Sequence, residues 1–98
     1  MPNLQGVHIF KSFEGEDFSD GTISGQYVDV TFNRAQFQRA TLDGTFLNVH
    51  FHMANLADAD LSNGTFVNAE FTDATVTETQ LKQAKALVNV KGPNGEQL

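Results

Sequence analysis

Cysteine is absent from the chain, which excludes a disulfide framework, a thiolate metal site and a cysteine nucleophile. Basic residues are scarce, with 6 Lys and Arg against 12 Asp and Glu, for a net charge of -6. Direct binding to nucleic acid or to an anionic membrane needs a basic patch, so this balance argues against both. The sequence also lacks an apolar run of about 18 residues and a charged-then-apolar leader. We therefore expect one cytoplasmic domain.

The sequence is rich, instead, in a five-residue repeat. In residues 44–71 large apolar residues stand five positions apart, which fits neither the period of about 3.6 of an α-helix nor that of about 2 of a strand. A Gly or Ala lies two positions before most of these centres, and the other positions are mostly Thr, Asn, Asp, Ser and Gln. Because such residues favour turns, we expect the chain to turn at every unit and to close a square coil after four units.

The centres of successive coils align in four columns. The first column consists of phenylalanines: Phe13, Phe32, Phe51 and Phe71. The second begins with aromatic residues and ends with aliphatic ones: Phe18, Phe37, Leu56 and Val76. The third is aliphatic: Leu4, Ile23, Leu42, Leu61 and Leu81. The fourth is mainly aromatic, with Ala86 as its expected continuation: His8, Tyr27, Phe46 and Phe66.

Like residues thus stack on like residues along each column, and offset ring stacking adds ~0.5–1.5 kcal/mol per aromatic pair. We predict that the large apolar centres form the core, in particular Phe13, Phe18, Phe32, Phe37, Leu42, Phe46, Phe51, Leu61, Phe66 and Phe71. One corner departs from the pattern, because the first three steps from the third column to the fourth take four residues. The small residue at this corner is always glycine, which permits positive φ or close backbone approach, so we expect a different turn there.

The units ANLAD, ADLSN and AEFTD resemble the A(D/N)LXX units of the pentapeptide-repeat family. The resemblance covers about residues 3–88 of a single domain, 1–98. It implies an all-β fold, a right-handed quadrilateral β-helix (a pentapeptide-repeat solenoid) of about four coils. At about residues 82–98 we expect a C-terminal cap or tail, with LKQAKALV as a short helical or irregular cap. GPNG predicts a turn that is followed by a frayed tail.

Candidate catalytic and metal-binding residues are few. His50 and His52 flank Phe51 and point outward together, but functional zinc sites need three or four ligands. Asp58 and Asp60 form a pair of carboxylates that face water, with no cleft implied. We therefore predict no catalytic, metal or cofactor site. His8 falls on an inward position at the N-terminal end of the fourth column, and we expect a half-exposed end residue whose ring bonds to the Tyr27 hydroxyl.

One outward row of residues is apolar. It follows the centres of the fourth column: Ile9, Val28, Leu47, Val67 and, if Ala86 is a centre, Leu87. Such a stripe is typical of a contact surface, although exposed Val and Ile are also common in strands. We predict a non-enzymatic structural or protein–protein interaction module. It is expected to form a homo-oligomer (a dimer) through this stripe, or to stack end to end with another pentapeptide-repeat chain.

Two alternatives remain open. Some pentapeptide-repeat proteins resemble duplex DNA in shape and charge, bind DNA gyrase and protect it from quinolones. The acidic balance fits such a DNA mimic, but the rod is short and Arg34 and Arg39 interrupt its carboxylates. The other alternative is a segment of a longer β-helix that a second chain completes, because the repeat is lost after Leu81 or Ala86.

Overall fold

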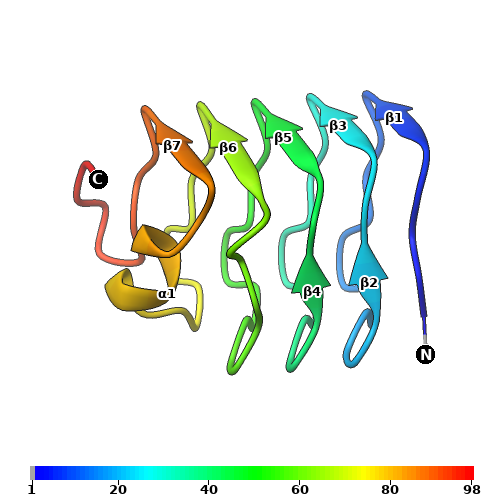
Figure 1. The fold of residues 1–98 in the computed structure, drawn as a ribbon, viewed down its shortest axis with the longest axis horizontal. Helices are drawn as coiled ribbons and strands as arrows, with labels where there is room; N and C mark the ends of the chain where they lie inside the picture. Colours follow the sequence, from blue (N-terminus) through cyan, green and yellow to red (C-terminus); the bar gives the residue numbers. More distant parts are fainter. Residues whose placement is uncertain (1) are drawn as a thin grey trace.

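The computed structural model describes residues 2–98 as a stack of similar coils (Figure 1). One side of the stack is a parallel sheet of five strands in the order β1 (Val7–Ile9), β3 (Gln26–Val28), β5 (Thr45–Leu47), β6 (Thr65–Val67) and β7 (Ala86–Val88). A second side holds the parallel pair β2 (Thr22–Ile23) and β4 (Thr41–Leu42). Single parallel bridges such as Thr31 to His50 and Gln36 to Asn55 link the coils on the other sides. The fold is the predicted all-β solenoid of about four turns, and its predicted right hand stays a prediction.

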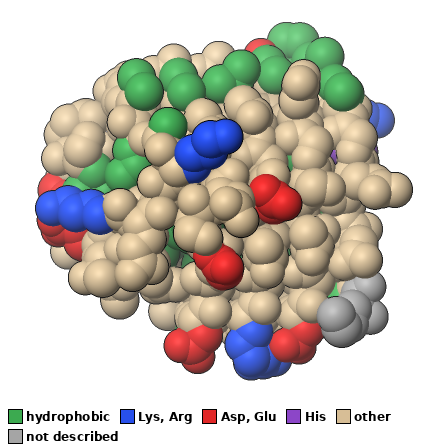
Figure 2. All heavy atoms as spheres, viewed as in Figure 1, with side chains coloured by type: hydrophobic (Ala, Val, Ile, Leu, Met, Phe, Trp, Pro, Cys, Tyr) green, Lys and Arg blue, Asp and Glu red, His purple; other side chains and the backbone are tan. Residues whose placement is uncertain are grey.

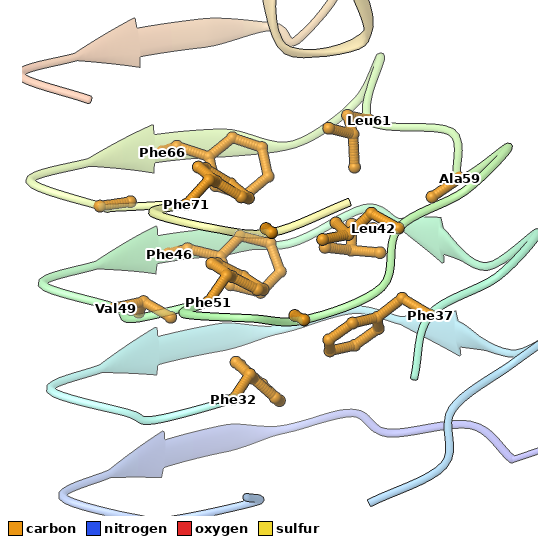
Figure 3. Packing of buried hydrophobic residues seen from close by; sticks show 14 of the residues in the cluster. Phe32, Phe37, Leu42, Phe46, Val49, Phe51, Ala59, Leu61, Phe66 and Phe71 are labelled. Atoms are coloured by element: carbon orange, nitrogen blue, oxygen red, sulfur yellow. The ribbon is translucent and has the colours of Figure 1, made fainter. Parts of the chain in front are cut away.

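The core is a ladder of stacked rings (Figure 3). Phe32, Phe51 and Phe71 lie one above another, with ring centroids 5.3 and 4.6 Å apart. Phe46 and Phe66 form a parallel stack, with centroids 4.9 Å apart. Of the ten residues predicted for the core, nine are buried: Phe18, Phe32, Phe37, Leu42, Phe46, Phe51, Leu61, Phe66 and Phe71. Phe13 is half-buried, because it belongs to the first coil and its column continues on one side only, where its ring stacks on Phe32.

Two kinds of corner turn the chain. After Phe32 and Phe51 the corner is a tight turn, in which the N–H of the residue three positions on donates to the phenylalanine carbonyl at 3.1 Å. Its third residue, Arg34 or Met53, has φ near +60°, as a type II turn requires. The glycine corner is built differently, as expected. A Cβ on Gly44 would lie 2.8 Å from the carbonyl oxygen of Gly25, so only glycine lets these coils approach.

The strand register shows that the coils lengthen along the stack. Gln26 lies beside Val7, Thr45 beside Gln26, Thr65 beside Thr45 and Ala86 beside Thr65, which gives coils of 19, 19, 20 and 21 residues. The longest coil was not expected. It contains α1 (Glu78–Lys82), which lies where earlier coils have a third-column strand. The helix begins earlier than LKQAKALV predicted, because Thr77 caps it.

The extra residue shifts the last strand by one position. Leu87, and not Ala86, lies beside Phe66, and Val88 lies beside Val67. Leu87 packs against the core. The prediction that Leu87 continues the outward apolar row is therefore wrong, and Val88 takes that place.

Residues 90–98 cover the C-terminal end of the stack. Gly95 donates to the carbonyl of Gly92 at 3.0 Å and closes the turn predicted at GPNG. The chain does not fray beyond this turn, because Gln97 pairs antiparallel with Lys91. Leu98 donates its N–H to the Val90 carbonyl at 2.8 Å and packs against the core. Bridges thus continue to Lys91, past the predicted limit of residue 88.

Candidate interaction surface

The outward face of the five-stranded sheet consists of two rows of side chains. Successive residues of a strand point to opposite faces, so the middle residue of each strand points inward and its two neighbours outward. The first row is Val7, Gln26, Thr45, Thr65 and Ala86. The second row, which we call the stripe, is Ile9, Val28, Leu47, Val67 and Val88. These ten positions carry no charged side chain.

The stripe runs along the whole stack. Ile9 and Val88 at its two ends are 50% and 54% exposed, and the three residues between them are half-buried. Figure 2 shows hydrophobic side chains along the edge of the molecule that Figure 1 assigns to β1, β3, β5, β6 and β7. A continuous apolar row of this length is typical of a contact surface.

Phe10 extends the stripe at the end formed by β1. It is 79% exposed and has φ +54°, a conformation that costs a bulky side chain roughly 1–2 kcal/mol. The equivalent corner residues of the later coils have φ of 53 to 55° and are types that tolerate this conformation: Asp29, Asn48, Asn68 and Asn89. Phe10 was not predicted as part of this surface, although alignment of the coils carries the signal, because Phe replaces Asp or Asn there.

Charged side chains lie on the other sides of the stack and pair between coils. Arg34 donates to Glu14 at 2.9 Å. Arg39 donates two hydrogen bonds to Asp20, at 2.7 and 2.9 Å, which lower the pKa of that carboxyl. His50 Nδ1 lies 3.1 Å from a carboxylate oxygen of Glu70. The sheet face is thus the uncharged side of an otherwise charged surface.

The structure brings no metal site together within residues 2–98, where no group of three or more potential ligands occurs. His8 is half-buried and stacks on Tyr27, with ring centroids 5.2 Å apart. The expected bond between His8 and the Tyr27 hydroxyl is wrong. Tyr27 donates to the carbonyl of Ser24, and His8 Nε2 lies 2.8 Å from the carbonyl oxygen of Gln5.

The carboxylates Asp58 and Asp60 are both exposed. Ser62 donates to Asp60 from its hydroxyl, at 2.6 Å, and from its backbone N–H, at 2.9 Å, and these bonds lower the pKa of Asp60. A general acid at neutral pH needs a raised pKa, so the shift has the wrong sign for that role. A hollow of about 380 Å³ beside α1 includes Asp58, and its other lining residues are not ionisable: Ala57, Ala74, Thr75, Val76, Thr77 and Gln80.

The pairing pattern, the filled core and the uncharged sheet face define a β-solenoid with a candidate contact surface. Within residues 2–98 no helix has the length and apolar character needed to cross a bilayer. Residues 51–85 match the family model described as pentapeptide repeats, with 8 copies. The predicted resemblance to the pentapeptide-repeat family is thereby confirmed.

The fold is also similar to a solved structure, a pentapeptide repeat protein from the thylakoid lumen of Arabidopsis thaliana. The TM-score is 0.47 at 19% sequence identity, over 83% of this chain and 64% of that chain. The chain thus spans 64% of the length of that protein. No curated protein matches the sequence.

Proposed function

We propose that this chain is a non-enzymatic protein-interaction module that associates with itself through the stripe. The observation that carries the proposal is the uncharged outward face of the five-stranded sheet, on a chain whose net charge is -6. Copies of an acidic protein repel one another, so an uncharged apolar face is where they approach at the lowest electrostatic cost. Proteins built from these repeats are typically structural or interaction modules, which agrees with the proposal.

The test is the molar mass of the purified protein across a wide range of concentration, by sedimentation equilibrium or light scattering. Self-association predicts a mass that rises with concentration from the monomer value of 10.7 kDa towards twice that value. A mass that stays at the monomer value up to the highest soluble concentration would refute the proposal. The proposal includes a cytoplasmic location, which fractionation of the native cells tests.

The DNA-mimic alternative draws support from the same net charge of -6. It is the weaker proposal, because arginines pair with the carboxylates of Glu14 and Asp20 along the stack. A DNA mimic needs unbroken rows of negative charge to imitate phosphates. A supercoiling assay with DNA gyrase distinguishes the two proposals: neither inhibition nor protection from quinolones is expected at micromolar protein.

Stacking end to end with another chain, including completion of a longer β-helix by that chain, is the third proposal. It has less support at the C-terminal end, where Leu98 and the turn at Gly92 cover the last coil. Charge substitutions on the stripe distinguish this proposal from association through the sheet face, because they leave both ends unchanged.

A further inference from the structure

We propose that two copies of this chain pack stripe against stripe with their solenoid axes antiparallel, so that Ile9 of one copy contacts the partner's Val88. The inference rests on the proposed self-association and specifies its geometry. A two-fold axis lies along β5, the middle strand of the sheet. Leu47 of one copy then meets the partner's Leu47 at this axis.

The symmetry of the sheet allows two arrangements, and they differ in which strands meet. A two-fold axis along β5 turns the partner end over end, so β1 faces β7, β3 faces β6, and the stripe stays on the stripe. A two-fold axis along the stack places every strand opposite the same strand of the partner, so Ile9 meets the partner's Ile9. Both are closed two-fold interfaces in which one patch serves both subunits.

The charges of the end coils favour the antiparallel arrangement. Residues 4–22 contain one basic residue, Lys11, and four acidic ones, for a net charge of -3: Glu14, Glu16, Asp17 and Asp20. Residues 78–98 contain two acidic residues and three lysines, for a net charge of +1: Lys82, Lys85, Lys91, Glu78 and Glu96. Antiparallel packing places coils of opposite sign side by side, whereas parallel packing places the two acidic coils together. Ion pairs neutralise Glu14 and Asp20 of the first coil and Glu78 of the last, and the side chains that remain still sum to -1 in the first coil and +1 in the last. Exposed charges escape full screening only within about 10 Å of each other, so this difference favours the antiparallel orientation where the end coils meet.

Phe10 and the available area support the same arrangement. Phe10 lies beside Ile9 at the end of the stripe, so antiparallel packing brings its exposed ring to the partner's Val88, which is itself half exposed. A four-sided stack with two ends has roughly a sixth of its 4924 Å² surface on each side. This is the ~800 Å² per partner that a standard stable interface buries.

Engineered cysteines test the geometry cleanly, because the chain has no cysteine of its own. Ile9→Cys and Val88→Cys are made as separate proteins, mixed, oxidised and analysed by mass spectrometry. The expected product is the mixed disulfide, with little cross-linking of either variant alone, whereas Leu47→Cys cross-links with itself. Thr72→Cys, an outward position on another side, is the control and is expected to stay monomeric.

The outcomes separate the inference from the proposed function. Self-cross-linking of Ile9→Cys without the mixed product would overturn the antiparallel arrangement and leave self-association intact. A mass that rises with concentration, with no cross-link at residues 9, 47 or 88, would place association on another face and overturn the inference. A monomer at all concentrations would refute both.

Phe10→Asn gives a second, independent test, because Asn occupies the equivalent corner in three later coils. The substitution relieves the strained backbone, so the isolated monomer is expected to melt at the same or a higher temperature. The dimer dissociation constant is expected to rise about tenfold or more, as for loss of a buried aromatic anchor. A dissociation constant that does not change would show that the ring takes no part in the interface, against the proposed packing.

Discussion

The rings of Phe51 and Phe71 lie 4.6 Å apart and within 5° of parallel, the closest of the aromatic pairs in residues 2–98. Phe51 also contacts the rings of Phe32, Phe46 and Phe66, so it joins three successive coils. Each coil of a solenoid depends on its neighbours for its core. The stability of the stack therefore depends strongly on this one ring.

Phe51→Ala is expected to lower the free energy of unfolding by ~3–5 kcal/mol, because the ladder closes only partly around the cavity. Chemical denaturation followed by circular dichroism measures the change. Met53→Ala, at the exposed corner that follows Phe51, is the matched control and is expected to change stability by no more than about 0.5 kcal/mol. Equal losses in the two variants would argue against Phe51 as a central core residue.

Leu47→Glu is expected to shift the protein from dimer to monomer, because it places a carboxylate at the middle of the uncharged stripe. Light scattering across concentration gives the readout. The control is Thr72→Glu, which is also half-buried and also follows an inward phenylalanine, but on another side. If both variants keep the mass of the unmodified protein, the stripe is not the interface.

The last full coil has α1 in place of a third-column strand, and the Gln80 side chain supplies hydrogen bonds to the preceding coil at this position. Its side-chain Nε2 donates to the carbonyls of Leu56 and Ala59 at 2.9 and 3.2 Å, and its Oε1 accepts from the N–H of Thr77 in the capping box. Gln80→Ala removes the side-chain partners of the Ala59 carbonyl and the Thr77 N–H, whereas the Leu56 carbonyl still accepts from the Ala59 N–H. A loss of about 1–3 kcal/mol is expected in the free energy of unfolding. Thr79→Ala, one position earlier on the exposed side of the helix, is the control. A loss no larger than that of the control would mean that water replaces the amide at no cost.

We expect the protein to lose stability at high pH, because Tyr27 is buried. Burial raises the pKa of its hydroxyl from 10.0 to about 12, because the ionised form is disfavoured in the core. Below pH 10 the contribution of Tyr27 to the free energy of unfolding is constant. Above pH 10 the hydroxyl ionises in the unfolded chain before it does in the folded protein, so the free energy of unfolding falls until about pH 12. The chain has a single tyrosine and no tryptophan, so ultraviolet absorbance reports this titration directly. Titration near pH 10 in the folded protein would contradict the burial of the hydroxyl.

The periodic part of the fold was predictable from the sequence because the same five-residue pattern recurs in every coil. Phe32, Phe51 and Phe71 fall in one column by counting alone, and their stacking then sets the register of each coil. The error at Leu87 shows the limit of counting. Leu81 keeps the five-residue spacing and is buried, although it lies in α1. The spacing up to Leu81 therefore gives no sign of the extra residue that follows it and moves Leu87 inward.

The signals for the missed features were local. Thr77 and Gln80 have the spacing of a capping box, which marks the start of a helix more directly than the apolar residues of LKQAKALV do. Phe10 was missed because the repeat describes inward residues well and outward ones poorly. A side chain in solvent is under no packing constraint, so only comparison with the Asp and Asn of the later coils reveals it.

The corner before the five-stranded sheet absorbs every change in coil length, from 19 to 21 residues, while each strand keeps an aligned neighbour. The stacking of the core side chains therefore does not depend on the length of the chain at this corner. A foreign peptide, or a small folded domain with adjacent termini, inserted next to Asn63 would be displayed from the side of the stack with the ladder intact. The corner is thus a natural grafting point for a protein engineer.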